Sequence, residues 1–223
     1  MNDSRTRPRP YAREDVRVQT GAEAAAFDAR SIEHVGVPQP VLMENAGRSA
    51  ALVVRRLFQP RRVVGLVGSG NNGGDALVVL RSLAAWGVEA AAVVVGDRDP
   101  ADPLLHGWSV EMHRDASLDD AGWGRVLAGT DVVIDGLLGT GVRGAPRRRQ
   151  AEVIDRINES GITVAALDVP SGIDASTGAL AGSAIRAALT VSFGAPKLGA
   201  LLHPGRAHVG RHVSVEIGFP PLE

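Results

Sequence analysis

The chain has 223 residues, a length typical of one α/β domain, and 44% of them are hydrophobic, which is enough for a sizeable core. The net charge of −1 and the absence of a long apolar run argue against nucleic acid and membranes as partners. Because the sequence has no cysteine, it excludes disulfides, thiolate catalysis and zinc–thiolate sites, and we expect a cytoplasmic location.

The N-terminal part of the chain predicts a leader followed by two helices. Residues 1–15 are rich in arginine and proline, so we expect a flexible leader there and a single domain over 16–223. Thr20 and Glu23 have the spacing of a capping box, which predicts a helix from Thr20 to about residue 35. A second helix is predicted over about 40–58.

Apolar strands then alternate with helices. The predicted strands span 63–67, 88–95, 131–135, 162–167, 187–193 and 207–217, and the predicted helices span 75–86, about 103–113, and 147–159. The early strands are apolar throughout, which is typical of a parallel sheet covered on both faces. The predicted fold is therefore α/β: a Rossmann-like three-layer αβα architecture with a mainly parallel sheet, preceded by the two N-terminal helices.

Three predicted strands end in loops that combine glycine with oxygen-bearing side chains, at 68–75, 135–144 and 168–172. Since ligands bind beyond the carboxyl ends of parallel strands, we expect these loops to meet at one site. The first loop matches G-x-G-x-x-G between a strand and a helix, which indicates a phosphate cradle, and it lacks the Gly-Lys-Ser/Thr of a P-loop.

Two aspartates at strand ends are candidate functional residues. Asp135 follows an apolar run, so we expect it to be partly buried and to need a cation or hydrogen-bond donors. Asp168 is a candidate general acid or base, and Pro170 fixes the direction of Asp168 and Ser171. Each aspartate could instead only stabilise its own turn.

Together with the segments at 42–47, 195–197 and 216–220, these loops resemble the YjeF N-terminal domain family over about residues 20–220. The resemblance implies an NAD(P)H-hydrate epimerase, an isomerase that interconverts the R and S epimers of NADHX and NADPHX. The nicotinamide ring of these compounds is hydrated at C6. The implied substrate-binding residues are Asn71, Asn72, Gly73, Gly74, Asp75, Gly139, Thr140, Gly141, Val142, Arg143, Gly144, Ala145 and Asp168.

The resemblance also implies a potassium ion held by Asn72, Asp135 and Ser171. A carboxamide, a carboxylate and a hydroxyl are hard oxygen donors, which suit a hard cation. C6 of the hydrate is a hemiaminal carbon, so its configuration is lost either by C–O cleavage or by ring opening. Both routes move a proton, and we predict that Asp168 is the catalytic group that moves it.

The sequence departs from the commonest family pattern at two positions. Ala76 stands where glycine often follows the Gly-Gly-Asp, and Gly136 stands where alanine often follows the strand-end aspartate. Lys197 is the single lysine beside 23 arginines and lies in a segment that the family favours. A specific need for an ammonium group and a surface salt bridge are equal alternatives for it.

Some relatives carry a C-terminal dehydratase domain, for which a chain ending at Glu223 leaves no room, so we expect a separate dehydratase in the same pathway. The two N-terminal helices are expected to offer a homodimer surface. A non-catalytic nucleotide-binding or scaffold domain of the same fold is the main alternative. An NAD-dependent oxidoreductase with Asp97 as the ribose-binding acid is another, but it leaves Asp135 and Asp168 without a role.

Overall fold

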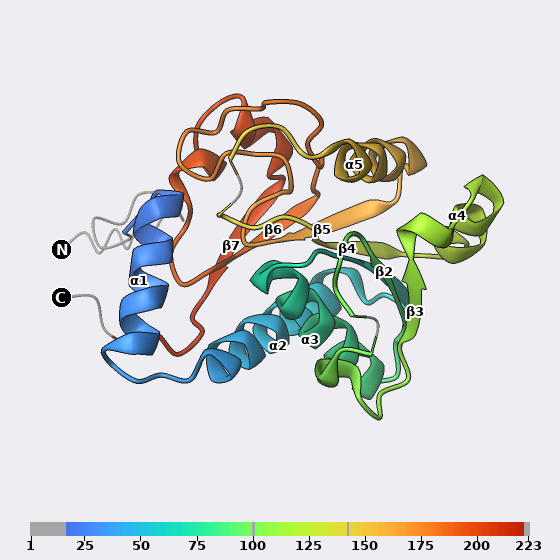
Figure 1. Cartoon of the computed structure of the whole chain (residues 1–223), viewed down its shortest axis with the longest axis horizontal. Coiled ribbons are helices and arrows are strands. Elements are labelled where there is room, and N and C mark those ends of the chain that lie inside the picture. Colours follow the sequence, from blue (N-terminus) through green and yellow to red (C-terminus); the bar gives the residue numbers. More distant parts are fainter. Residues whose placement is uncertain (1–16, 100, 142, 221–223) are drawn as a thin grey trace, which may run out of the picture.

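A seven-stranded parallel sheet forms the centre of the computed structural model, which describes residues 17–99, 101–141 and 143–220. The strands are β1 (Arg62–Val67), β2 (Glu89–Val94), β3 (Glu111–Arg114), β4 (Val132–Gly136), β5 (Thr163–Leu167), β6 (Leu189–Phe193) and β7 (Arg211–Val215), in the order β3-β2-β1-β4-β5-β6-β7 (Figure 1). The predicted α/β fold with a parallel sheet is confirmed. The predicted leader and Val142 lie outside the described residues.

Five α-helices surround this sheet in the described part of the chain. They are α1 (Gly21–Glu33), α2 (Gln39–Phe58), α3 (Asn71–Ala85), α4 (Asp120–Leu127) and α5 (Arg148–Ser160). Figure 1 shows α2 and α3 on one side of the sheet and α5 on the other. None of the helices described is long and apolar enough to cross a membrane.

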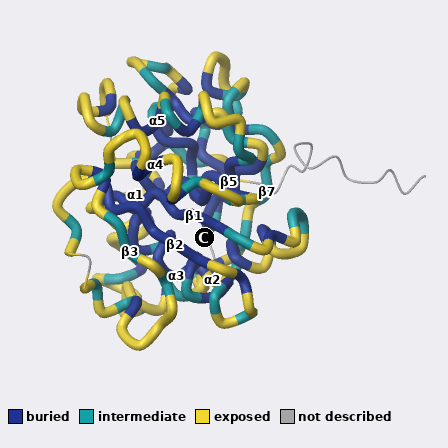
Figure 2. The backbone as a smooth tube through the Cα atoms, turned by 90° about the vertical axis from the view of Figure 1, so that its right-hand side faces the viewer, coloured by how far each residue is buried: buried dark blue, intermediate teal, exposed yellow. Residues whose placement is uncertain are grey.

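Alternate residues of the strands build two separate cores. In β1, Val63 and Val67 pack in the core that includes α2 and α3, whereas Val64 and Leu66 pack in the core that includes α4 and α5. Side chains alternate between the two faces of a strand, so a strand covered on both faces must be apolar throughout. Figure 2 shows the central strands β1 and β2 as buried and much of the outer chain as exposed.

The first helix is attached to the C-terminal part of the chain. Its capping box is present: the Thr20 side chain accepts from the Glu23 backbone N–H, and the Glu23 carboxylate accepts from the Thr20 N–H. The rings of Phe27 and Phe219 lie 4.8 Å apart, and the Gly21 N–H donates to Ser176 Oγ at 3.0 Å. These contacts hold α1 beside the carboxyl end of the sheet, where it forms a wall of the cavity described below.

The prediction of a helix over about 103–113 is wrong. That stretch contains a 3₁₀ turn (Pro103–Leu105) and then β3, which pairs in parallel with β2 at the edge of the sheet. Gly107 between them has φ +82°, a left-handed conformation that ends a helix. The following helix, α4, was not predicted. It is short, contains two glycines, and is capped by Asp119, which accepts from the Gly122 N–H at 2.7 Å.

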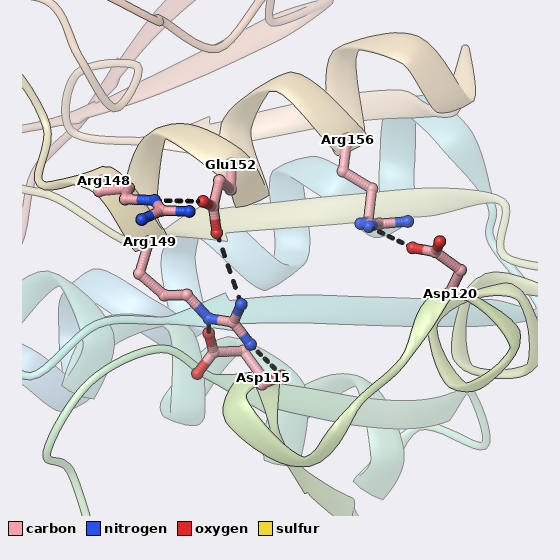
Figure 3. A network of polar contacts seen from close by, with 6 residues as sticks. All are labelled: Asp115, Asp120, Arg148, Arg149, Glu152 and Arg156. Carbon is pink, nitrogen blue, oxygen red and sulfur yellow. Dashed lines mark hydrogen bonds and ion pairs between the residues drawn. The ribbon is translucent and has the colours of Figure 1, made fainter.

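An ion-pair network connects α5 to the chain before and within α4 (Figure 3). Arg149 of α5 donates to the carboxylate of Asp115 at 2.6 Å and to its carbonyl at 2.8 Å. Arg156 donates to Asp120 at 2.7 Å, and Glu152 accepts from Arg148 and Arg149. Asp115 is buried, so its pair with Arg149 has more structural weight than the exposed pairs around it.

Candidate functional site

A cavity of about 780 Å³ opens at the carboxyl ends of the central strands. The strand order changes direction between β1 and β4, which is where an open parallel sheet binds its ligand. The volume lies within the range of small-molecule sites. The predicted substrate-binding residues that line it are Asn71, Asn72, Gly73, Asp75, Gly139, Thr140, Gly141, Arg143, Ala145 and Asp168.

Two other residues predicted to bind substrate do not line this cavity. Gly74 packs against α2, where a Cβ on it would lie 2.6 Å from Met43 Cε. Gly144 is exposed and has φ +78°. Gly74 therefore permits the close packing of α3 on α2, and Gly144 permits a left-handed turn.

The glycine loop needs glycine for close approach of the backbone. A Cβ on Gly68 would lie 1.9 Å from the carbonyl oxygen of Leu137, and a Cβ on Gly73 would lie 1.9 Å from that of Gly68. Helix α3 begins at Asn71, four residues earlier than predicted, and its N-cap Gly70 provides no side-chain hydrogen bond. The first turn of α3 therefore presents backbone N–H groups and the positive end of the helix dipole to the cavity.

Arg98, which sequence reasoning missed, holds the glycine loop from behind. Its guanidinium donates to the carbonyl oxygens of Gly68 at 2.8 Å and Gly70 at 2.5 Å, and it pairs with Asp102 at 2.6 Å. Arg98 itself is not among the residues that line the cavity, so these bonds support the loop from outside it. The neighbouring Asp97, which an oxidoreductase would need to bind ribose, does not line the cavity.

Asn72, Asp135 and Ser171 converge beside the glycine loop. The buried Asp135 carboxylate accepts from Ser171 Oγ at 2.6 Å and from the Ser171 and Leu137 N–H groups at 2.8 and 3.2 Å. Asn72 donates to the carbonyl oxygen of Leu138 at 2.8 Å, and Ser171 Oγ accepts from the N–H of the same residue at 2.9 Å. The three residues that sequence analysis grouped together are therefore close in space.

The electrostatics of this group favour a cation. Burial raises the pKa of Asp135, and the hydrogen bonds from Ser171 and Leu137 act in the opposite direction. Among the described residues, the buried Oδ1 of Asn72 has no hydrogen-bond partner. A buried carbonyl oxygen without a partner is costly, and a cation bound to it would remove that cost. Asn72, Asp135 and Ser171 can thus supply three oxygen ligands to a hard metal ion.

Asp168 is fixed by β6 and by Lys197. Its backbone has φ +66°, a left-handed conformation uncommon for a residue other than glycine, and its carbonyl accepts from Ser192 Oγ at 2.8 Å. Its Oδ1 accepts from the Lys197 ammonium and from the Phe193 N–H at 3.2 Å. Unusual backbone conformations that the surroundings hold in place are frequent at active sites.

Lys197 is buried, so the surface salt bridge considered for it is wrong. Only 3% of the residue is exposed, and Nζ contacts Asp168 Oδ1 and donates to the Phe193 carbonyl at 2.8 Å. Lys197 also lines the cavity. The signal in the sequence was its isolation among arginines, which pointed to a specific role but not to its partner.

Two further carboxyl groups line the cavity near this pair. Burial raises the pKa of Asp75 well above its ordinary value, and the charges of Asp168 and Asp28 act in the same direction. Burial also raises the pKa of Asp28 to about 6. Sequence analysis missed Asp28, which lies inside an alanine-rich helix with no motif around it. The cavity therefore brings three carboxyl groups and one ammonium together.

Comparison with known proteins identifies the family. Residues 39–199 match the family described as YjeF-related protein N-terminus. The chain belongs to this family. Its fold is similar to that of the crystal structure of yeast ynu0, YNL200c, with a TM-score of 0.77, 24% sequence identity, and coverage of 92% of this chain and 90% of the yeast chain.

Two kinds of curated relative are similar to the chain. It is 35% identical to the NAD(P)H-hydrate epimerase of Rhodopirellula baltica, covering 87% of this chain and 81% of that protein, and 34% identical to that of Weissella koreensis, covering 92% and 93%. It is 40% identical to the bifunctional NAD(P)H-hydrate repair enzyme Nnr of Hyperthermus butylicus, covering 91% of this chain. The chain spans about two fifths of the length of such bifunctional relatives.

Proposed function

We propose that this chain is an NAD(P)H-hydrate epimerase, an isomerase that interconverts the R and S epimers of NADHX and NADPHX in nicotinamide nucleotide repair. The observation that carries the proposal is the ion pair between the buried Lys197 and the half-buried Asp168, which lines the same cavity as a glycine loop suited to phosphate. The names of the relatives from Rhodopirellula and Weissella support the same substrate.

In this proposal, one wall of the cavity binds the phosphates of the substrate and another carries the group that transfers the proton. We assign phosphate binding to the first turn of α3, which offers backbone N–H groups, and to residues 139–141 and Arg143, which line the same cavity. Asp168 lies on the adjoining wall and is the group that we assign to proton transfer at the hydrated ring. Epimerisation involves no change of redox state, so it needs only a proton donor, a proton acceptor and a ligand that is held in place.

We also propose that Asn72, Asp135 and Ser171 hold a potassium ion. The unpaired Oδ1 of Asn72 and the buried carboxylate of Asp135 support this assignment. When bound, the ion would supply positive charge beside the first turn of α3, where the phosphates of the substrate are expected. The residues themselves fix the position of the loop at 137–138 through the bonds of Asn72 and Ser171 to Leu138.

The setting of the reaction follows from the same proposal. The product would pass to an NAD(P)HX dehydratase activity, and the bifunctional repair enzymes that are similar to the chain over part of their length support this. A cysteine-free sequence suits the cytoplasm.

The exposed apolar side chains of Val35, Val41 and Leu52 on and beside α1 and α2 support a homodimer. Light scattering of the purified protein would test this.

The test is direct. The protein is incubated with (R)-NADPHX, with potassium or with choline as the monovalent cation, and the ratio of epimers is followed by chromatography. Equilibration of the epimers is expected, faster with potassium, and it should be lost in Asp168→Ala. Binding without conversion would support the non-catalytic alternative, and conversion at the wild-type rate by Asp168→Ala would overturn the role of Asp168.

A further inference from the structure

Asp75 and Asp168, two half-buried carboxyl groups that line the cavity, have opposite surroundings. Asp168 Oδ1 faces two donors, the Lys197 ammonium and the Phe193 N–H, an arrangement suited to a carboxylate that accepts. In the described part of the chain, no hydrogen bond to the side chain of Asp75 is found, although Asp75 lines the same cavity. Two carboxyl groups in contrasting environments are the usual basis for separate acid and base roles.

We propose that Asp75 and Asp168 divide the proton transfer: Asp75 donates a proton to the substrate, and Asp168, positioned by Lys197, accepts one. This assignment rests on the proposed epimerase function and deepens it. It gives Asp75, otherwise expected only to contact the substrate, a catalytic role. Lys197 is a positioning residue, since it acts through Asp168, whose Oδ1 it contacts.

In the ring-opening route the two groups act in one step. The C6 hydroxyl gives its proton to Asp168 while the C6–N1 bond breaks, and the electron pair of that bond remains on N1, which takes a proton from Asp75. The products are an aldehyde at C6 and an N–H at N1. Rotation about the C5–C6 bond presents the other face of the aldehyde, and the reverse step closes the ring and returns both protons.

The charges around Asp75 agree with a proton donor. Asp28 on α1 and Asp168 after β5 are acidic, and both raise the pKa of Asp75, as burial does. Lys197 after β6 and Arg98 after β2 act in the opposite direction but are occupied by other partners: Lys197 by Asp168 and the Phe193 carbonyl, and Arg98 by Asp102 and the loop carbonyls. The charges of Asp28 and Asp168 therefore act together with burial to favour the protonated form of Asp75.

The deciding experiment compares Asp75→Asn with Asp168→Asn, with Asp120→Asn as the control. Asp120 is exposed, lies on α4 outside the residues that line the cavity, and forms an ion pair with Arg156, so this control should keep wild-type kinetics. An amide can donate a hydrogen bond but cannot transfer a proton. We therefore expect Asp75→Asn to lower kcat by about 100-fold or more while KM changes only a few-fold.

The pH dependence of the wild type provides a test that does not depend on a variant folding well. An acid that must be protonated makes kcat/KM fall as the pH rises, and this alkaline limb should be absent from the residual activity of Asp75→Asn. A wild-type profile without an alkaline fall, or an Asp75→Asn protein with wild-type kcat and only a raised KM, would overturn the assignment. Failure of the wild type to epimerise would instead overturn the proposed function.

Discussion

The two departures from the family pattern, Ala76 and Gly136, are in contact, and we predict that each makes the other tolerable. A Cβ on Gly136 would lie 2.5 Å from Ala76 Cβ and 2.6 Å from the Asn72 carbonyl oxygen. Carbon atoms pack at about 3.5–4.0 Å, so Gly136→Ala alone must move α3 away from β4 by about 1 Å. Overpacking of this kind costs about 1–3 kcal/mol.

The reverse change has a cost of a different kind. Ala76→Gly places glycine in a helix and removes a buried methyl group, with a combined cost of about 1–2 kcal/mol. The double variant carries at each position the residue that the family often has. It removes the overlap between the two methyl groups, while the close approach to the Asn72 carbonyl oxygen remains. We expect it to be less destabilised than the sum of the single variants by about 1–3 kcal/mol.

Urea unfolding followed by circular dichroism measures all three variants against the wild type. Because the first turn of α3 carries Asn72, Gly136→Ala should also raise KM, and the double variant should restore it. If the free energies of unfolding of the single variants add to within about 0.5 kcal/mol, the two positions are independent and the packing argument is wrong.

Three further predictions follow from the site and its supports. Arg98→Met removes the bonds to the loop carbonyls, so KM should rise about tenfold with kcat within a few-fold of the wild type; a fall in kcat alone would contradict a supporting role. Partial desolvation in the cavity wall raises the pKa of Asp28 from 3.8 to about 6, so the wild type should lose stability relative to Asp28→Asn as the pH rises from about 4 to about 6. The loss should be at most about 1 kcal/mol, because much of the side chain still faces solvent, and equal unfolding curves at acid and neutral pH would contradict it. Asp115→Ala leaves Arg149 without its buried partner and should lower the free energy of unfolding by about 1–3 kcal/mol, against near zero for Asp120→Ala.

The sequence predicted correctly those elements that depend on residues close together in the chain. The capping box at Thr20, the apolar strands and the glycine loop each depend on residues a few positions apart, and the structure confirms them. The prediction was wrong over about 103–113, where a short polar strand is stabilised by its pairing with β2 rather than by its own composition. Edge strands of this kind depend on their neighbour, which no local pattern reveals.

The same distinction applies to the site. The loops after β1, β4 and β5 could be grouped from sequence because parallel strands end at one edge of a sheet. Asp28 and Arg98 could not, since each acts across the cavity or behind the loop from an element with no glycine or motif of its own. Their positions depend on the packing of α1 and on the path of the chain after β2, which are properties of the whole fold.

Lys197 lies between the residues that the sequence could assign to the site and those that it could not. It follows β6 by four residues, and β6 pairs in parallel with β5, so its loop opens beside that of Asp168. Because the other 23 of the 24 lysine and arginine positions are arginine, a lysine in a buried position indicates that this site requires a side chain that arginine cannot replace. Here the need is geometric: a compact ammonium reaches both Asp168 Oδ1 and the Phe193 carbonyl, whereas a planar guanidinium is larger and presents its donors in a fixed fork. A strong compositional bias thus makes its rare exceptions informative about chemistry, but only the fold reveals which partner the exception serves.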